Sequence, residues 1–253
     1  MVRKRNTNGI EHFEWSGQYW IKRPLWGVMH TGEPHAWFDP YCVSIDDNNC
    51  ANIQFRRNPV EIKVEDKTYN PVLGRGWMES TVEFKYGVFS WDAILPTGCN
   101  LWPALWLGSD YSWPPEIDCM EGWSNNNPNY IKRFLFRNIK PTVHWNNAQG
   151  EHLQESKNNI CRCILHPGKK VDNFKVVWTR NYVDVLYNNI RVKRFNNKEL
   201  LAQLNQKDVF MHPIMSYDVQ TNSKLLLDAQ NGKDFVLDEK SVFKVFGFDY
   251  CPC

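Results

Sequence analysis

Three carboxylates stand close together in the stretch PPEIDCMEGW, which otherwise has the composition of a buried strand. They are Glu116, Asp118 and Glu121, and the intervals between them are two residues and then three. Side chains of a regular strand alternate between its faces, so Glu116 and Asp118 share one face and Glu121 falls on the other. One extra residue around Cys119 and Met120, a β-bulge, resets the alternation and directs all three carboxylates into one groove.

Paired carboxylates in a groove are the groups that cleave glycosidic bonds. With the bulge counted as one step, the Cα atoms of Glu116 and Glu121 lie about four strand steps apart, or roughly 13 Å. Inclined side chains bring the carboxyl groups to roughly 5 Å, the separation of a retaining glycosidase, whereas an inverting enzyme needs more room for its water. Three acids in one groove also repel one another, which raises at least one pKa and favours a protonated general acid.

Two other interpretations apply to three clustered acids. A solvated edge strand would alternate its charges regularly and would need no bulge. A calcium site gathers its oxygen ligands from a loop with Gly and Asn rather than from a strand between Trp113 and Trp123. The sequence therefore favours catalysis with no metal and no required cofactor, and a structural calcium ion stays open as an alternative.

The elements that must position these acids are typical of an antiparallel β-sandwich. Short runs of alternating apolar and polar residues are separated by clusters of Asn, Gly, Pro and Asp, as in VEIKVED and YVDVLYNNIRVKRF. The second run predicts a hairpin that turns at Asn188 and Asn189, because Asn tolerates positive φ. Only residues 197–208 have helical periodicity, and residues 124–140 and 147–171 are expected to form long loops.

Length and composition predict one domain over residues 1–253, because 253 residues with 42% hydrophobic content can bury a full core. The 12 Trp, 10 Tyr and 14 Phe exceed the needs of such a core, which indicates rings on a binding surface suited to sugars. The net charge is only +2, yet residues 123–172 carry eight Lys/Arg against three Asp/Glu. This local positive charge indicates either a solvated basic loop or a site for an anionic partner. The absence of a basic helical stripe or motif excludes nucleic acid as a partner.

The eight cysteines and the chain start bear on location. An even count fits disulfides in a secreted protein, while the pairs Cys161/Cys163 and Cys251/Cys253 leave a zinc site or plain thiols open. No stretch has the length of a membrane span, and the basic start is not followed by an apolar run. We expect a monomer that is secreted, periplasmic or on the cell surface, with its signal absent from this chain, or alternatively part of a phage or virus.

The run LWPALWLGSDYSWPPEIDCMEGW closely resembles glycoside hydrolase family 16, whose hallmark is Glu-x-Asp-x-x-Glu after a Trp-Pro-Ala-x-Trp-Leu strand. The segments FKYGVFSWDAILPTG, TVHW, FKVVWTRNYVDVLYNN and MHPIMSYDVQ resemble further strands of the family in its order, over most of residues 80–250. The first 60 residues match only in strand character. The resemblance implies a concanavalin A-like jelly roll of two curved antiparallel sheets, a concave cleft, and an endo-acting enzyme that cleaves a polysaccharide by double displacement.

By position in that motif, Glu116 corresponds to the nucleophile, Glu121 to the general acid/base and Asp118 to the assisting carboxylate. The resemblance also places a His near the acid/base and sugar-stacking Trp residues beside the acids. Trp106 and Trp178 are better candidates for the core. The residues expected to contact substrate are Trp102, Trp113, Trp123, His144, Trp145, Arg133 and Arg137.

Substrate preference follows from departures from the family pattern. The segment SYDVQTN, residues 216–222, stands where β-glucanases of the family typically carry Asn-Leu-Ala-Val-Gly-Gly. Together with Lys132, Arg133, Arg137 and Lys140, it favours a decorated or sulfated galactan cut at internal β-1,4 or β-1,3 bonds. The alternatives are a β-1,3(4)-glucanase of the laminarinase or lichenase type, a non-catalytic lectin on the same fold, or a structural jelly-roll protein of a virus or phage.

Overall fold

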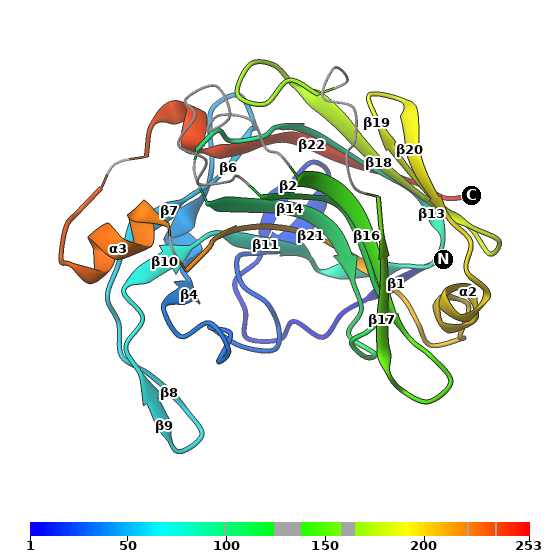
Figure 1. Cartoon of the computed structure of the whole chain (residues 1–253), viewed down its shortest axis with the longest axis horizontal. Helices are drawn as coiled ribbons and strands as arrows, with labels where there is room; N and C mark the ends of the chain where they lie inside the picture. Colours follow the sequence, from blue (N-terminus) through cyan, green and yellow to red (C-terminus); the bar gives the residue numbers. More distant parts are fainter. Residues whose placement is uncertain (99, 124–137, 158–164, 222, 236) are drawn as a thin grey trace.

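Two large antiparallel sheets, stacked as the layers of a sandwich, make up most of the computed structural model (Figure 1). The all-β jelly-roll fold expected from the sequence is confirmed. The side chains of Trp123 and Asn138 are not described. Apart from these, the structure describes residues 1–98, 100–123, 138–157, 165–221, 223–235 and 237–253.

The eight-stranded sheet carries the three clustered acids on β15, one of its inner strands. In spatial order this sheet contains β17 (His152–Ser156), β16 (Asn138–Asn146), β15 (Glu116–Trp123), β14 (Leu101–Gly108), β21 (His212–Val219), β11 (Trp77–Ser80), β3 (Gln18–Ile21) and β2 (Phe13–Trp15). The seven-stranded sheet contains β20 (Ile190–Phe195), β19 (Val183–Tyr187), β18 (Asp172–Trp178), β13 (Gly87–Ile94), β22 (Phe243–Cys251), β6 (Ala51–Ile53) and β5 (Val43–Ile45).

Smaller elements surround the sandwich. In the described residues, three short sheets pair β10 (Leu73–Arg75) with β4 (Ala36–Phe38) on one side and β7 (Phe55–Arg57) on the other, β1 (Val2–Lys4) with β12 (Val82–Phe84), and β8 (Ile62–Val64) with β9 (Lys67–Tyr69). The described part of the chain contains the helices α2 (Lys198–Leu204) and α3 (Lys224–Gln230), with short 3-10 turns at Pro40–Cys42 and Glu239–Ser241.

The apolar core lies between the two large sheets because one face of each strand is apolar. From β13, Phe89 and Trp91 point inward with no exposed surface, while the intervening Ser90 is half-buried. From β15, Ile117 and Met120 reach the same core cluster. The acids of β15 therefore lie on the opposite face of their sheet, turned away from the core.

Several local predictions can be compared directly with the structure. The hairpin turn is confirmed, since Asn188 and Asn189 have φ angles of 49° and 66°. The helix predicted over residues 197–208 is present as the shorter α2, capped by the Asn197 side chain. The long loop predicted over residues 147–171 is wrong in part, because β17 lies within it; its sequence HLQES has too few apolar residues to show alternation.

The cysteines give no disulfide within the described part of the chain. Cys42, Cys50 and Cys119 are buried free thiols, and Cys251 and Cys253 are exposed free thiols. The remaining three cysteines, and with them the zinc alternative, lie outside the described residues. None of the helices in the described ranges is long and apolar enough to cross a membrane.

Candidate active site

A β-bulge in β15 sets the direction of the three acids, as the sequence predicted. Asp118 pairs with Trp106 of β14 and Met120 pairs with Leu105, so Cys119 is the extra residue without a partner in that ladder. Cys119 and Met120 both face the core and are fully buried. The bulge therefore returns Glu121 to the face that carries Asp118.

The opposite sheet supports this bulge through Tyr187, the last residue of β19. Its hydroxyl donates a hydrogen bond of 2.9 Å to the main-chain oxygen of Cys119. The Tyr187 side chain has no exposed surface, and burial raises its pKa well above its ordinary value, so the phenol stays protonated and can donate. Sequence patterns did not indicate this contact, because the two residues are 68 positions apart.

We expect Tyr187→Phe to lower the free energy of unfolding by about 1–3 kcal/mol, because the Cys119 carbonyl loses its donor inside the core. The variant keeps the ring and its edge contact with Phe174, so a denaturant titration measures mainly the lost hydrogen bond. Tyr182→Phe on the partly exposed end of the same hairpin serves as the control, with little expected change. Equal stability of parent and Tyr187→Phe would show that the bulge does not depend on this contact.

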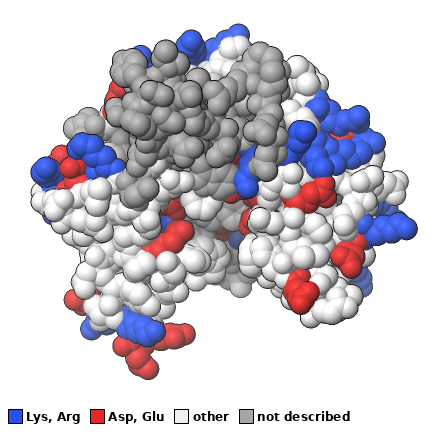
Figure 2. Space-filling model, viewed as in Figure 1, with Lys and Arg blue, Asp and Glu red and all other residues white. Residues whose placement is uncertain are grey.

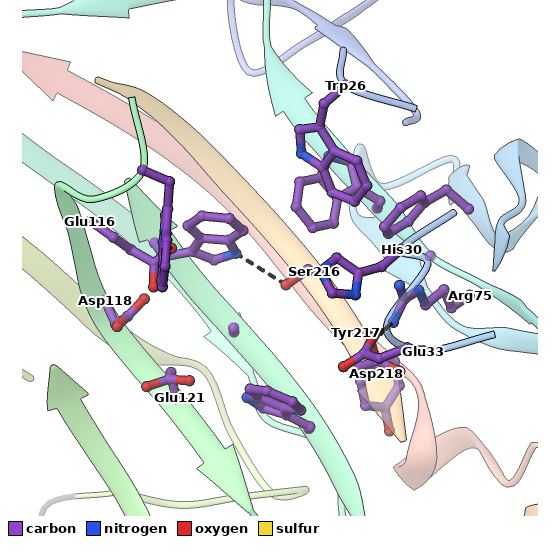
Figure 3. Close-up of a pocket in the computed structure, with 17 residues that line it drawn as sticks. Trp26, His30, Glu33, Arg75, Glu116, Asp118, Glu121, Ser216, Tyr217 and Asp218 are labelled. Carbon is purple, nitrogen blue, oxygen red and sulfur yellow. Dashed lines mark hydrogen bonds and ion pairs between the residues drawn. The ribbon is translucent and has the colours of Figure 1, made fainter. Parts of the chain in front are cut away.

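The three acids line a pocket of about 320 Å³ on the open face of the eight-stranded sheet. Figure 3 shows them in a row along β15, on one wall of the pocket. Seen from the direction of Figure 2, this face of the molecule is hollowed between the lobe that ends in β8 and β9 and the lobe that carries β16 and β17. A polymer chain can therefore reach the carboxylates from the side.

Burial raises the pKa of all three carboxyl groups. For Glu116, burial acts first and the negative charge of Asp118 second, while His144 opposes both. For Asp118, burial is followed by the charge of Glu121, and Lys140 opposes them. Burial also raises the pKa of Glu121, against the opposing effects of Lys140 and of hydrogen bonds. Burial and mutual repulsion therefore disfavour the state in which all three groups carry a full negative charge.

Hydrogen bonds distinguish the two glutamates. The Trp113 indole Nε1 donates to Oε2 of Glu116 over 3.0 Å. Glu121 accepts a hydrogen bond of 3.1 Å from the Thr142 hydroxyl. Each glutamate is thus held from its own side of Asp118, at a fixed place in the pocket.

His144 joins the cluster from β16, next to Asp118 and Glu116, whereas the resemblance placed it beside the acid/base Glu121. Its Nε2 lies 3.3 Å from Oδ2 of Asp118 and 3.6 Å from Oε1 of Glu116. The register places His144 directly opposite Glu116 in the β15–β16 ladder. Neighbouring strands thus bring the imidazole and two carboxyl groups together.

The other residues expected to contact substrate have different outcomes. Trp102 and Trp113 line the pocket, and Trp113 is 62% exposed, so its ring is open to a ligand. The prediction for Trp145 is wrong: it follows His144 in the strand, so it points to the opposite face and lies in the core at 4% exposure. The side chains of Trp123, Arg133 and Arg137 lie outside the described residues.

Trp106 also departs from expectation. Predicted to be a core residue, it lines the pocket and donates a hydrogen bond of 3.1 Å to the Ser216 hydroxyl (Figure 3). It lies on the same face of β14 as Trp102, four residues earlier, since alternate residues of a strand share a face. Trp178 is in the core, as predicted.

The wall opposite the acids was not identified from the sequence. It presents Trp26, His30, Glu33 and Arg75 (Figure 3). Arg75 is buried and donates to Glu33 over 2.6 Å and to Asp218. Trp26 is 58% exposed. The only available signal was Asp218, which belongs to the unusual SYDVQTN segment; the other residues come from distant parts of the chain.

Among the residues that the structure describes, two groups of side chains have metal-ligating atoms close enough to share an ion. One is Glu116, Asp118 and His144, with two carboxyl groups and one nitrogen, which is a poor match to the six to eight oxygens that calcium takes. The other is Glu83, Asp110 and His212. Both of its acids already form ion pairs, with Arg3 and Arg5, so a further cation would meet positive charge.

Glu79 is buried beside the second group, with its Oε2 3.8 Å from Nε2 of His212. Its Oε2 accepts a hydrogen bond of 3.0 Å from Trp77, which lines the pocket, and its Oε1 forms an ion pair of 2.8 Å with Arg5. Burial raises the pKa of Glu79 from 4.5 to about 7, against the opposing charge of Arg5. Between about pH 4.5 and pH 7, the folded protein therefore holds a proton on Glu79 that the unfolded chain releases.

This proton uptake makes stability depend on pH. Because the folded pKa is the higher one, the contribution of Glu79 is complete below about pH 4.5 and is lost as the pH rises through about 7. Glu79→Gln keeps the shape and cannot titrate. We expect the stability advantage of the parent over this variant to shrink by about 2–3 kcal/mol between pH 4.5 and pH 8. Urea titrations at several pH values test this, and a constant difference would contradict it.

A jelly-roll sandwich with a bulged strand that directs three carboxyl groups into an open cleft defines a class of carbohydrate-active proteins. Comparison with known proteins places the chain within that class: residues 46–168 match a family model described as "XgeA-like, catalytic GH16 domain". This match assigns residues 46–168 to glycoside hydrolase family 16.

Individual relatives agree with this family. The chain is 32% identical over 130 residues to "Endo-1,3-1,4-beta-glycanase ExsH" of Rhizobium meliloti (strain 1021), an alignment that covers 47% of this chain and 26% of that protein. It is 39% identical over 109 residues to "Probable glycosidase C21B10.07" of Schizosaccharomyces pombe, covering 41% of this chain and 25% of that protein. The chain thus spans about a quarter of the length of these curated relatives.

Among solved structures, porphyranase B from Zobellia galactanivorans superposes with a TM-score of 0.69 at 12% identity, over 98% of this chain and 92% of that one. At this level of identity the likeness shows the fold alone.

Proposed function

We propose that this chain is a retaining, endo-acting glycoside hydrolase that cleaves internal β-linkages of a polysaccharide. The observation that carries the proposal is the bulged strand β15, which directs Glu116, Asp118 and Glu121 into one cleft. The match of residues 46–168 to family 16 supports the same assignment. The chemistry needs no cofactor, since the carboxyl groups provide the nucleophile, the acid and the base.

The proposed reaction has two displacements at the anomeric carbon. In the first, a carboxylate oxygen of Glu116 attacks this carbon while the Glu121 carboxylic acid gives its proton to the departing glycosidic oxygen. In the second, the Glu121 carboxylate takes a proton from water, the water oxygen attacks the same carbon, and the ester bond to Glu116 breaks. Asp118 lies between the glutamates and tunes their charge, and two inversions give net retention.

Endo action is supported by the open course of the cleft. Trp26 and Trp113 line the catalytic pocket and also a second hollow, bounded by Asn6, Ser109 and Asp110. A chain bound at the acids can therefore continue between the two exposed rings and along the protein surface. Exposed aromatic rings of this kind stack on sugar faces.

For the substrate, we propose a neutral β-1,3- or β-1,4-linked glucan. The described residues that line the pocket include five carboxyl groups, one guanidinium and one imidazole, and the guanidinium of Arg75 is already paired with Glu33 and Asp218. Such a surface attracts sugar hydroxyls and repels sulfate esters. The relative from Rhizobium meliloti, an endo-1,3-1,4-β-glycanase by name, supports the same choice.

A sulfated or decorated galactan, the preference drawn from the sequence, is the second candidate. It depends on SYDVQTN and on four basic residues, of which Lys132, Arg133 and Arg137 lie outside the described part of the chain. Asp218 of SYDVQTN is bound to Arg75, so this segment contributes a neutralised pair. The galactan therefore has less support than the glucan.

A panel of polysaccharides with mass analysis of the products separates these candidates. Laminarin and mixed-linkage glucan should give a ladder of oligosaccharides, while porphyran and carrageenan should give none. Proton NMR of the first products should show the β-anomer, as retention requires. If the parent bound a glycan but cleaved none of the panel, the protein would be a lectin. If it cleaved only the sulfated galactans, the substrate proposal would be reversed.

We also infer that the protein acts outside the cytoplasm, in a secreted, periplasmic or cell-surface form, because an intact polysaccharide chain is too large to enter a cell. Association with a phage or virus particle is the alternative. Action as a monomer is likewise a prediction, and sedimentation of the purified chain tests it.

A further inference from the structure

A second histidine, His152 of β17, lies against His144. The two imidazole rings are stacked, with centroids 5.1 Å apart and planes within 14°. Nδ1 of His144 is 2.9 Å from Nε2 of His152, which is the distance of a hydrogen bond. One nitrogen of His144 thus binds His152, while the other faces the acids of β15.

The acids on the other side determine which nitrogen should carry hydrogen. Nε2 of His144 lies 3.3 Å from Asp118 and 3.6 Å from Glu116. A neutral imidazole has one N–H and one lone pair, and a lone pair at Nε2 would face the negative charge of the ionised nucleophile. The favourable tautomer has hydrogen at Nε2 and the lone pair at Nδ1, where the N–H of His152 can bind it.

His152 also contacts Trp113, whose indole donates a hydrogen bond to Glu116. The Trp113 ring lies 4.9 Å from the His152 ring and 6.2 Å from the His144 ring, and its Nε1 donates to Glu116. The loop that carries Trp113 is anchored by a hydrogen bond of 3.1 Å from Gln203 to the Pro114 oxygen. His152 therefore touches both the imidazole that faces the acids and the indole that donates to Glu116, although it does not itself line the pocket.

We propose that His152 is a positioning residue: its hydrogen bond to Nδ1 of His144 keeps the Nε2 hydrogen of His144 directed at Asp118 and Glu116, and so holds the nucleophile ready for attack. The proposal rests on the function proposed above. His152 is exposed and belongs to the strand that the sequence failed to indicate, so no strand pattern pointed to it.

Two substitutions separate the hydrogen bond from ring stacking. His152→Phe keeps an aromatic ring against Trp113 and His144 but has no nitrogen, whereas His152→Gln lacks the ring but keeps a side-chain amide that can donate to Nδ1. We expect kcat/KM to fall about tenfold in His152→Phe, mainly through kcat, and to recover to within about twofold of the parent in His152→Gln. Equal losses in the two variants, or no loss in His152→Phe, would overturn the proposal.

Nitrogen-15 NMR of the imidazoles gives a readout that needs no substrate. In the parent, the His144 shifts should show hydrogen on Nε2 and a hydrogen-bonded lone pair on Nδ1; in His152→Phe they should show a mixture of tautomers. An unchanged His144 tautomer in His152→Phe would refute positioning even if hydrolysis slowed. If the parent cleaved no glycan, the proposed function would fail, and the tautomer would still decide the role of His152.

Discussion

Glu116→Gly is expected to lower the rate of polysaccharide hydrolysis by at least about 10⁴-fold, because no group remains to form the glycosyl-enzyme ester. The Glu116 side chain faces the pocket instead of the core, so the variant should still fold and bind the glycan. Reducing-end assays and retention on substrate-loaded gels measure the two properties separately. Glu14→Gly, an exposed position on β2 of the same sheet, is the matched control and should keep the activity of the parent.

Azide tests the assigned role of Glu116 by stereochemistry. In Glu116→Gly the space left by the side chain admits azide, which attacks the anomeric carbon of an activated β-glycoside from the face opposite the leaving group. A single inversion gives the α-glycosyl azide and restores turnover. Formation of the β-glycosyl azide by this variant would exchange the roles of Glu116 and Glu121, and full activity without azide would exclude Glu116 as the nucleophile.

The bulge was predictable because it is a local property of β15. Side-chain alternation has a period of two, so an interval of three between Asp118 and Glu121 can serve one groove only with an extra residue. The turn at Asn188 and Asn189 was predictable for a similar local reason, because Asn tolerates the positive φ that a two-residue hairpin turn requires. In both cases the determining interactions lie within a few residues.

Features that depend on packing between distant segments were not predictable. Whether Trp145 faces the cleft depends on which face of β16 meets the core, and His144 and Trp145 are equally suited to either face. Tyr187 supports the bulge from the other sheet, and Arg75 meets Asp218 across 143 positions. A short polar strand such as β17 depends on its neighbour β16 for pairing, so its own sequence gives little sign of it.

Glu121→Ala is expected to show a loss that depends on the leaving group. For a polysaccharide, the glycosidic oxygen must be protonated as the bond breaks, so kcat/KM should fall by about 10²–10⁴-fold. For a dinitrophenyl β-glycoside, the leaving group needs no proton, and the first displacement should proceed at nearly the rate of the parent. The glycosyl-enzyme should then accumulate, because no base activates water, and mass spectrometry of the intact protein detects it.

The pH dependence of kcat/KM also tests the role of Glu121 as general acid. A general acid and a nucleophile need opposite protonation states, so they affect opposite limbs of the pH profile. A general acid must hold its proton, so the parent kcat/KM should fall as the pH rises past the pKa of Glu121, which burial raises above its ordinary value. This alkaline limb should be absent from the profile of Glu121→Ala, and azide should give the β-glycosyl azide by attack on the ester. If the limb persisted, the proton would come from another member of the cluster, and Asp118, whose pKa is also raised, would be the group to replace next.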